Sequence, residues 1–310
     1  MAELLGMLSQ ARGVLLTTHK DPDGDGFSCA LAMQELLKAR GVPSLTVTQT
    51  VPRFLEFLPG ASAVCHTVPA DFIYTLVLAL DCSRQERLWL LPGLSLEGRM
   101  LVNVDHHMDN SNYGQFNLVD DAAATGEMIF PLWQQAGVPL NQAAATCIYT
   151  AVFTDTGGFR YSNTSARTFE VAQACVRAGA PVAEVALCAY GSRTRADFEM
   201  LGATLSSLET HADGKVVSAV IDADRYGESA REAIDFIRDL DTAEVAVAFR
   251  SYHSQGYVKV NLRSKRFFNV QQVAQHFGGG GHVRASGVEI PGFVEAVKPK
   301  VIDEIVRRFA

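Results

Sequence analysis

Short runs of apolar and β-branched residues recur through the first half of the chain, and each run ends at a polar or charged turn. Four of them have the length of strands and lie at residues 14–18, 44–48, 75–80 and 100–104. They are apolar or β-branched at nearly every position, whereas a strand with one solvated face alternates between apolar and polar residues. Helical patterns lie at residues 27–40, 126–135, 141–154, 166–178 and 182–190. This order predicts an α/β fold built on a parallel sheet that is covered on both faces.

The pattern changes after residue 190, which indicates a second domain. Residues 191–197 are polar and follow the last helix of the first series. Strand-like runs then lie at 215–221, 245–251 and 257–263, and helical patterns at 228–240, 270–277 and 293–309. We therefore predict a first domain over residues 1–190, a linker over 191–200 and a smaller α/β domain over 201–310.

Charge is distributed unevenly along the chain. The net charge is −7, but residues 250–310 contain 10 Lys and Arg against 4 Asp and Glu, and residues 1–249 contain 17 against 30. Solvated faces of ordinary composition could differ in this way. The alternative is that an acidic half holds metal ions while a basic half receives a substrate that carries phosphate.

Composition excludes several classes of protein. With 48% hydrophobic residues in 310, the chain can form a buried core, so a disordered protein is excluded. The apolar runs end well before the roughly 20 residues of a membrane span, and residues 1–10 lack the basic flank and cleavage site of a secretory signal. The six cysteines are scattered without a CxxC pair, which argues against a disulfide framework or a thiolate zinc site. We therefore expect a cytoplasmic protein with no membrane partner.

A polar loop directly after the first predicted strand carries one imidazole and three carboxylates within seven residues. It runs from His19 to Gly26, and its carboxylates belong to Asp21, Asp23 and Asp25. A turn rich in Asp and Gly that caps the next helix would explain one of these carboxylates. It does not explain the others together with His19, so the loop suggests metal ligands.

Three further positions place Asp or His at the end of a predicted strand or helix. Asp81 follows the third strand, Asp105-His106-His107 follows the fourth, and Asp155 lies at the end of a helix. A cap or an exposed turn would explain any one of them singly. The carboxyl ends of parallel strands open onto one crevice, so we expect these side chains to converge. A helix dipole disfavours a carboxylate at the carboxyl end of a helix, and a cation near Asp155 would stabilise it.

Together these positions supply carboxylate and imidazole ligands without a thiolate. The candidate metal ligands are His19, Asp23, Asp25, Asp81, His106 and Asp155. Such a donor set suits Mn²⁺ or Mg²⁺ better than structural zinc. It contains enough carboxylates for two ions that share one bridging Asp, an arrangement that stabilises both the attacking and the leaving oxygen in a displacement at phosphorus.

The same residues resemble the DHH phosphoesterases. The resemblance rests on His19-x-x-x-Asp23-x-Asp25, Asp81, Asp105-His106-His107 and Asp155. The four glycines at 278–281 with the following His282, and Arg263 behind a strand, are similar to the DHH-associated C-terminal domain, so the resemblance covers nearly the whole chain. The length of the chain and the stretch at 158–164 look like the branch of nanoRNases and pAp phosphatases, since the RecJ exonucleases are usually longer.

This resemblance implies a role for each residue of the first domain. His19 and Asp23 would hold one ion, Asp25, His106 and Asp155 the other, and Asp81 would bridge them. The expected cofactor is Mn²⁺, as two ions, with Mg²⁺ as the alternative. Asp105 would orient a neighbouring ligand, and His107 would face the scissile phosphate as a hydrogen-bond donor or as an acid near the leaving group. Water would be the nucleophile, without a covalent enzyme intermediate.

A glycine run and its neighbours form the predicted substrate-binding set. Its members are Arg263, Gly279, Gly280, Gly281, His282 and Arg284. Glycines let backbone N–H groups approach an anion closely, and arginines can bind two phosphate oxygens at once. A flexible loop would also explain the glycines. If the basic domain holds a terminal phosphate while the acidic domain cleaves the next linkage, the active site lies in the cleft between the domains and favours very short strands.

One part of the first motif departs from the family pattern. The family commonly continues with Asp-Ala-x-Gly-Ser, whereas Asp25 is followed here by Gly26-Phe27-Ser28-Cys29. The ligands are retained, but the start of the helix and the usual serine contact differ. Cys29 lies near the expected ions. Because the sequence shows no partner that would activate a thiolate, we interpret Cys29 as a packing residue rather than a nucleophile.

We predict a two-metal phosphoesterase that hydrolyses short oligoribonucleotides and pAp-type nucleotides to mononucleotides. Its partners would be short single-stranded RNA and small phosphorylated nucleotides, not duplex DNA, because a protein of net charge −7 gains little from nonspecific phosphate attraction. The sequence leaves a homodimer open. The alternatives are a phosphodiesterase for cyclic di-AMP or linear pApA, a manganese-dependent inorganic pyrophosphatase, whose phosphate clamp usually lacks a glycine run, and a nucleotide-binding regulator, which would not need all six ligands.

Overall fold

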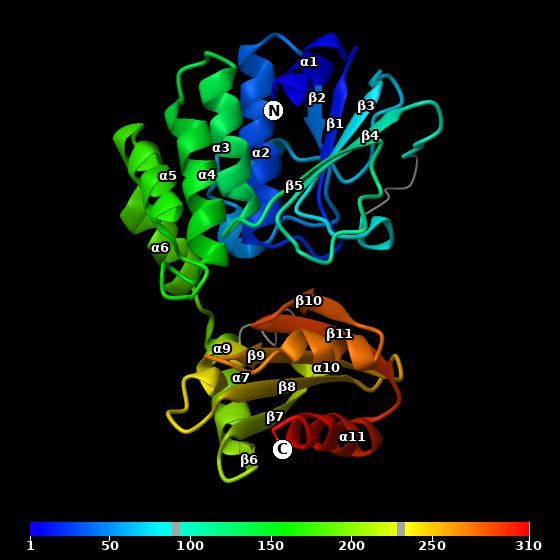
Figure 1. Cartoon of the computed structure of the whole chain (residues 1–310), viewed down its shortest axis with the longest axis vertical. Coiled ribbons are helices and arrows are strands. Elements are labelled where there is room, and N and C mark those ends of the chain that lie inside the picture. Colours follow the sequence, from blue (N-terminus) through cyan, green and yellow to red (C-terminus); the bar gives the residue numbers. More distant parts are fainter. Residues whose placement is uncertain (89–93, 228–232, 310) are drawn as a thin grey trace. The chain divides into compact units, whose positions relative to one another are not determined.

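The computed structural model describes residues 1–88, 94–227 and 233–309. The chain folds as two compact units, Met1–Ser192 and Arg193–Ala310. Figure 1 labels the helices and strands of both units. Each unit combines helices with a β-sheet of its own, as predicted for an α/β protein.

A five-stranded parallel sheet forms the centre of the first unit. Its strands, in the order β2-β1-β3-β4-β5, are β1 (Val14–Thr17), β2 (Ser44–Thr46), β3 (Leu76–Leu80), β4 (Met100–Asp105) and β5 (Phe116–Val119). Each neighbouring pair of strands runs parallel. The prediction of a parallel sheet is confirmed, and the first four strands lie within two residues of their predicted bounds.

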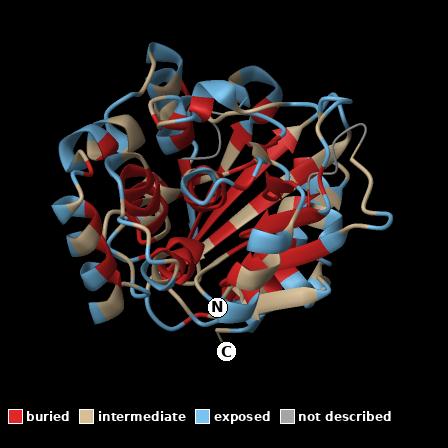
Figure 2. Ribbon diagram, turned by 90° about the horizontal axis from the view of Figure 1, so that it is seen from above, coloured by how far each residue is buried: buried red, intermediate tan, exposed pale blue. Residues whose placement is uncertain are grey.

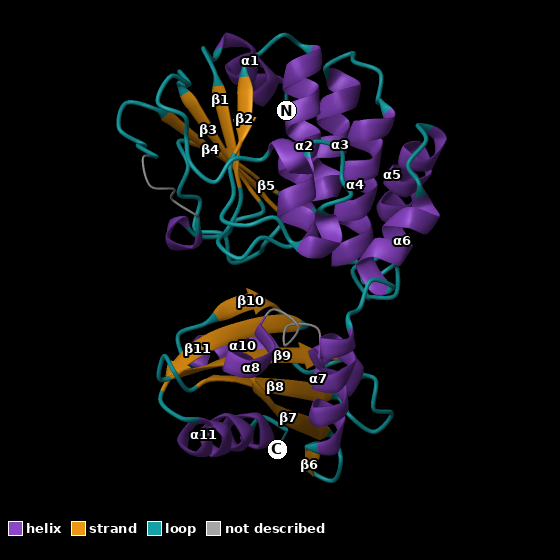
Figure 3. Ribbon diagram, turned by 180° about the vertical axis from the view of Figure 1, so that it is seen from behind, coloured by secondary structure: helices purple, strands orange, loops and turns teal. Residues whose placement is uncertain are grey.

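The two faces of this sheet pack into different clusters of apolar side chains. Val14 and Leu16 enter the large core, whereas Leu15 and Val77 point to the opposite face. The helices that contribute to the large core are α1 (Ala2–Gln10), α2 (Gly24–Ala39), α3 (Thr125–Gln135), α4 (Gln142–Asp155), α5 (Ala166–Arg177) and α6 (Val182–Tyr190). Figure 3 shows most of these helices gathered on one side of the sheet. Side chains of the connecting segments pack on the other face, so β1, β3 and all but the first residue of β4 are buried, and these strands are mostly apolar. Figure 2 colours the buried residues of the chain red.

Two elements of the first unit have no clear signal in the sequence. β5 (FNLV) is a half-buried edge strand that includes Asn117, so it lacks the uniform apolar pattern of its neighbours. α1 is a nine-residue helix without a side-chain N-cap. Short 3₁₀ segments lie in the connections, as η1 (Arg53–Leu55), η2 (Ala61–Ala63) and η3 (Gln85–Arg87).

A six-stranded mixed sheet forms the second unit, in the order β10-β11-β9-β8-β7-β6. Its strands are β6 (Glu209–His211), β7 (Val216–Asp222), β8 (Val245–Tyr252), β9 (Tyr257–Ser264), β10 (Gly280–His282) and β11 (Ala285–Pro291). β7 and β8 are parallel, and the other neighbouring pairs are antiparallel. Its described helices are α7 (Arg195–Ser206), α8 (Ala223–Tyr226), α9 (Ala233–Arg238), α10 (Val270–His276) and α11 (Val294–Arg307).

The second unit differs from the sequence-based expectations at α7, at α9 and at the glycine run, and the sequence analysis did not predict β6, α8 or β11. Residues 195–200 of the predicted linker belong to α7, because the hydroxyl of Thr194 caps that helix by accepting the N–H of Asp197 at 3.1 Å. Of the predicted helix at 228–240, α9 covers Ala233–Arg238, and residues 228–232 lie outside the described residues. Gly280 and Gly281 are not loop residues, since they belong to β10 and pair with β11.

A helix that crosses a membrane must be both long and apolar. Among the residues that the structure describes, no single helix is long and apolar enough to cross a bilayer. Ala166–Arg177 and Val182–Tyr190 meet that criterion only when taken jointly, and the two helices are bent by 116° relative to one another.

Candidate metal centre

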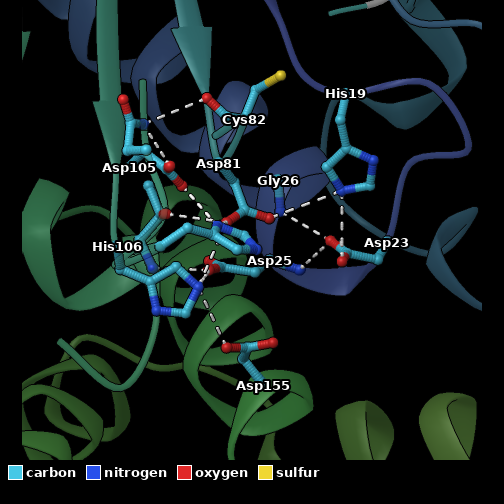
Figure 4. A network of polar contacts seen from close by, with 12 residues as sticks. His19, Asp23, Asp25, Gly26, Asp81, Cys82, Asp105, His106 and Asp155 are labelled. Carbon is cyan, nitrogen blue, oxygen red and sulfur yellow. Dashed lines mark hydrogen bonds and ion pairs between the residues drawn. The ribbon is translucent and has the colours of Figure 1, made fainter. Parts of the chain in front are cut away.

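The predicted metal ligands gather at the carboxyl ends of β1, β3 and β4 and at the adjoining helix ends (Figure 4). His19 lies in the loop after β1, Asp81 directly follows β3, and His106 directly follows β4. Asp25 belongs to the first turn of α2, and Asp155 is the last residue of α4. Parallel strands point their carboxyl ends to one edge of the sheet, so segments far apart in the sequence meet here.

His19, Asp23 and Asp81 form a first triad of potential ligands, with one donor atom of each lying within 4.8 Å of the others. Nε2 of His19 is 3.4 Å from Oδ2 of Asp23 and 3.8 Å from Oδ2 of Asp81. Asp23 is also the N-cap of α2, because its Oδ1 accepts the N–H groups of Asp25 and Gly26, both at 3.1 Å. The cap uses one oxygen and the other faces His19, so capping and metal binding are compatible.

Asp25, His106 and Asp155 form a second triad with the same spacing of donor atoms, within 4.8 Å. Nε2 of His106 is 3.8 Å from Oδ2 of Asp25 and 3.4 Å from Oδ2 of Asp155. It is also 3.4 Å from Oδ1 of Asp81, whose Oδ2 faces His19. One carboxylate therefore lies between the two triads and turns a different oxygen toward each.

Backbone carbonyls orient the two histidine rings. Nδ1 of His19 lies 2.7 Å from the carbonyl oxygen of Lys20, and Nδ1 of His106 lies 3.0 Å from that of Ala122. A carbonyl oxygen only accepts hydrogen bonds, so Nδ1 carries the proton and Nε2 faces the carboxylates. Histidines that bind a metal ion through one nitrogen are commonly oriented in this way through the other.

The amino terminus of α3 holds Asp25 from the opposite side. Oδ2 of Asp25 accepts the N–H of Thr125 at 2.6 Å, and Oδ1 accepts the N–H of Gly126 at 3.0 Å. The positive end of the helix dipole favours a carboxylate at this place. The hydroxyl of Thr125 also donates to Oδ1 of Asp81 at 3.2 Å, so one residue that the sequence analysis missed contacts two predicted ligands.

Asp105 and His107 adjoin the triads. Oδ1 of Asp105 lies 2.7 Å from Nδ1 of His107, which is 3.5 Å from Oδ1 of Asp81. Asn110 donates to Oδ2 of Asp105 at 2.5 Å and to Oδ1 of Asn103 at 2.7 Å. Sequence reasoning missed both asparagines. A signal for Asn103 exists, because it is a fully buried polar residue inside an otherwise apolar strand.

The crowded carboxylates have pKa values that move in opposite directions. Burial and the neighbouring charge of Asp81 raise the pKa of Asp25 well above its usual range, and burial raises the pKa of Asp155 to about 6. Burial also opposes ionisation of Asp81, but its hydrogen bond with His106 and the charge of His107 hold its pKa below the usual range. Ionisation of all these carboxylates would leave more negative charge than the histidines compensate, and a cation bound there would offset it.

Close packing explains the glycine that departs from the family pattern. A Cβ atom on Gly26 would lie 2.1 Å from Oγ1 of Thr18 and 3.3 Å from Cβ of Asp81. The thiol of Cys29 donates to Oδ1 of Asp25 at 3.2 Å, and burial followed by the charge of Asp25 raises the pKa of Cys29 well above its usual range. The thiol stays protonated, which supports a packing role.

Two of the predicted substrate-binding side chains lie on one face of the sheet of the second unit. His282 of β10 pairs with Ala285 of β11, which pairs with Arg263 of β9, so the three project on the same side. Nε of Arg263 is 3.9 Å from Oδ1 of Asp235, and the guanidinium also donates to the carbonyl of Leu262 at 3.2 Å.

The glycine run has a structural reason as well. The N–H of Gly279 donates to the carbonyl of Ala274 at 2.8 Å, so this group serves the turn after α10. A Cβ atom on Gly279 would lie 2.3 Å from the carbonyl oxygen of Gly287, and one on Gly281 would lie 2.6 Å from that of Ala285. Close approach of β11 therefore excludes side chains here. Arg284 is likewise engaged, since its Nη1 donates to the carbonyl of Phe268 at 2.9 Å.

Comparison with known proteins relates both units to one family. The DHH family, N-terminal domain, matches residues 13–152, and the DHHA1 domain matches residues 213–310. The bifunctional oligoribonuclease and PAP phosphatase NrnA of Thermus thermophilus is 32% identical over 301 residues, which cover 95% of this chain and 90% of that protein. The protein of the same name from Bacillus subtilis is 26% identical over 305 residues, which cover 95% of this chain and 94% of that protein.

Solved structures share the fold at lower identity. An exopolyphosphatase-related protein from Bacteroides fragilis superposes with a TM-score of 0.85 at 19% identity, covering 99% of this chain and 95% of that chain. RecJ of Thermus thermophilus in complex with Mg²⁺ gives a TM-score of 0.53 at 16% identity, and the match covers 99% of this chain but 51% of RecJ. The two-unit fold thus recurs inside a longer protein.

Proposed function

This chain belongs to the DHH family, and from that membership and the arrangement of its carboxylates we propose that it is a two-metal phosphoesterase. Its proposed substrates are short oligoribonucleotides and pAp-type nucleotides, which it hydrolyses to mononucleotides. The observation that carries the proposal is the position of Asp81, whose two oxygens face the histidines of two separate triads at 3.8 Å and 3.4 Å.

The donor set fits a pair of divalent cations. The triads offer oxygen and imidazole nitrogen and no thiolate ligand, which favours Mn²⁺ or Mg²⁺, and we propose Mn²⁺. In this assignment His19 and Asp23 would hold one ion, Asp25, His106 and Asp155 would hold the other, and Asp81 would serve both. Two cations bound there would stabilise negative charge on the attacking and leaving oxygens of an in-line displacement at phosphorus.

His107 is the proposed catalytic side chain. Its Nδ1 donates to Asp105 at 2.7 Å, so Nε2 is the nitrogen at which the ring gains or loses its second proton. A protonated Nε2 can donate a hydrogen bond to a nonbridging phosphate oxygen or a proton to the leaving oxygen. Asp105 acts through this ring: it fixes the orientation of the imidazole and stabilises the imidazolium.

The relatives support the substrate class. The proteins of Thermus thermophilus and Bacillus subtilis are named bifunctional oligoribonuclease and PAP phosphatase, and each match covers at least 90% of both chains. Both substrate types carry a phosphate ester on a nucleotide. We propose that the second unit binds this phosphate and its nucleoside through Arg263, Gly279, Gly280, Gly281, His282 and Arg284.

A substrate panel tests the function. The purified protein with Mn²⁺ is offered pApA, di- to pentanucleotide RNA, pAp, cyclic di-AMP and pyrophosphate at equal concentration, and released mononucleotide and phosphate are measured. We expect the short RNAs and pAp to be hydrolysed fastest. Faster turnover of cyclic di-AMP or pyrophosphate would overturn the substrate assignment. If the protein binds Mn²⁺ but hydrolyses none of the five compounds, the phosphoesterase assignment is wrong.

Replacement of Arg263 by Ala tests the substrate-binding role of the second unit. A hydrogen bond to a charged group contributes about 1.5–3 kcal/mol, so we expect KM for pApA to rise about 10- to 100-fold with bound Mn²⁺ unchanged. Arg195→Ala is the matched control, because Arg195 lies in the same unit, is 93% exposed and pairs with Glu199 in its own helix. Equal KM values in the two variants would contradict the role of Arg263.

A further inference from the structure

A single turn of the backbone touches two members of the second triad. This turn, residues 122–126, ends the connection from β5 and includes the first two residues of α3. The carbonyl of Ala122 holds Nδ1 of His106 at 3.0 Å, and the N–H groups of Thr125 and Gly126 hold the carboxylate of Asp25 at 2.6 and 3.0 Å. The position of this turn therefore determines where Nε2 of His106 and the oxygens of Asp25 lie.

The side chain of Asn163 ties the third member to the same turn. Nδ2 of Asn163 donates to the carbonyl of Ala123 at 3.0 Å and to the carbonyl of Asp155 at 3.2 Å. A side-chain amide carries two hydrogens, and here each has its own backbone acceptor. From the other side, Oε2 of the buried Glu127 accepts the N–H of Ala123 at 3.3 Å. Both polar backbone groups of Ala123 are thus held by side chains.

The segment that presents Asn163 is itself held tightly next to Asp155. The carbonyl of Thr156 accepts the N–H groups of Arg160 and Tyr161, both at 3.0 Å. Phe159 adopts a left-handed backbone conformation with φ of 64°, which is unusual for a bulky residue. Its N–H donates to Oγ1 of Thr156 at 3.1 Å, and its ring packs against Phe153 of α4 with centroids 5.6 Å apart. The aromatic contact and the hydrogen bonds retain a conformation that would otherwise be strained.

We propose that Asn163 is a positioning residue for the ion of the second triad. It joins Asp155 to the turn that orients His106 and Asp25, and so keeps the three ligands at the spacing that one cation requires. This inference rests on the proposed two-ion site but is independent of the substrate. Side chains that orient metal ligands from outside the coordination shell typically change metal affinity about 10- to 100-fold when they are removed.

Titration of Mn²⁺ into two variants tests this role. Asn163→Ala removes the amide, and Asn163→Leu removes both donors at similar volume without adding charge near the cations. In each we expect one of two Mn²⁺ affinities, measured by calorimetry, to weaken about 10- to 100-fold while the other is unchanged. We expect kcat for pApA to recover at saturating Mn²⁺, with KM for pApA unchanged. Because Asn163 is exposed, thermal unfolding in EDTA should be unaltered.

Asn117→Ala is the matched control. The amide of Asn117 also donates to two backbone carbonyls, those of Asn112 at 3.2 Å and Gly114 at 2.8 Å, and neither acceptor belongs to a proposed ligand or to the turn at 122–126. We expect it to leave both Mn²⁺ affinities at the wild-type values. Unchanged affinities in both Asn163 variants, or an equal loss at both sites, would overturn the proposal. If the wild-type protein binds two Mn²⁺ ions but cleaves no phosphoester, the proposed function is wrong. The role of Asn163 can still be tested in that case, because the Mn²⁺ affinities do not depend on a substrate.

Discussion

Nδ1 of His107 donates a hydrogen bond to Oδ1 of Asp105, and the two atoms lie 2.7 Å apart. The second oxygen of Asp105 accepts from Asn110 at 2.5 Å, so the carboxylate cannot rotate without losing a hydrogen bond. The pair fixes the tautomer of a ring whose side chain is 12% exposed. Burial alone would lower the pKa of His107, but the hydrogen bond to Asp105 and the charge of Asp81 raise it above its usual range.

Replacing Asp105 by Asn should therefore lower the pKa of His107. The variant loses the negative charge, and its amide can donate to Nδ1, which favours the wrong tautomer. We expect the alkaline limb of the kcat profile to move to lower pH and kcat at pH 8 to fall about 10²-fold, since general acid catalysis contributes on that order. Steady-state hydrolysis of pApA from pH 5 to 9 measures both effects. A superimposable profile would show that His107 does not act as an acid.

Replacing Asp81 by Asn should abolish the shared ligand while keeping the backbone. Asp81 has a φ of 55°, and Asn is among the few residues that tolerate this left-handed conformation. We expect Mn²⁺-dependent hydrolysis of pApA to fall about 10³-fold, because several kcal/mol of charge stabilisation depends on the ions. Circular dichroism in EDTA should still report a cooperative transition. Substantial remaining turnover would contradict the bridging role.

Mn²⁺ should stabilise the protein more at pH 8 than at pH 5. In the metal-free fold burial raises the pKa of Asp155 to about 6, above the ordinary 3.8 of the unfolded chain. A raised carboxyl pKa gives stability that is complete below about pH 4 and is lost as the pH rises through 6. Mn²⁺ needs the ionised carboxylate, so protons compete with it at low pH. Thermal unfolding with EDTA or Mn²⁺ at both pH values measures the difference, and equal shifts would contradict it.

A methyl group on Gly26 should destabilise the fold at the site. Its Cβ would lie 2.1 Å from Oγ1 of Thr18, so we expect Gly26→Ala to lower the free energy of unfolding by about 1–3 kcal/mol, as overpacking commonly does. The double variant with Thr18→Ala should recover part of this loss in urea unfolding. Gly6→Ala is the control, since nothing lies within 4 Å of a Cβ atom there. If the losses of unfolding free energy in the two single variants simply add in the double variant, a clash between these side chains is excluded.

Part of the site could be predicted because its residues follow local patterns in the sequence. The strands that end at Leu80 and Asp105 are buried on both faces, so their apolar pattern marks their ends, and the polar residues that follow are forced toward one edge of a parallel sheet. The loop after the first strand predicted Asp23 as a metal ligand, and a helix cap was the alternative for one carboxylate of that loop. The structure makes it a cap through one oxygen and leaves the other oxygen toward His19.

Other residues could not be predicted because their partners are distant in sequence. Thr125 meets Asp25 across 100 residues, and Asn163 meets Ala123 across 40, so no local pattern marks either contact. The glycines at 278–281 suggested an anion-binding loop. In the structure close approach of β11 also requires Gly279 and Gly281, a constraint that exists only once strands pair.

The sequence by itself determined which chemical groups the chain offers and on which edge of the sheet they stand, since apolar periodicity and strand ends are local properties. Only the tertiary structure decided at what distances these groups stand from one another and which amides hold the ligands in place. Those distances depend on how helices α2, α3 and α4 pack against one another, and packing sums many weak contacts between residues far apart along the chain.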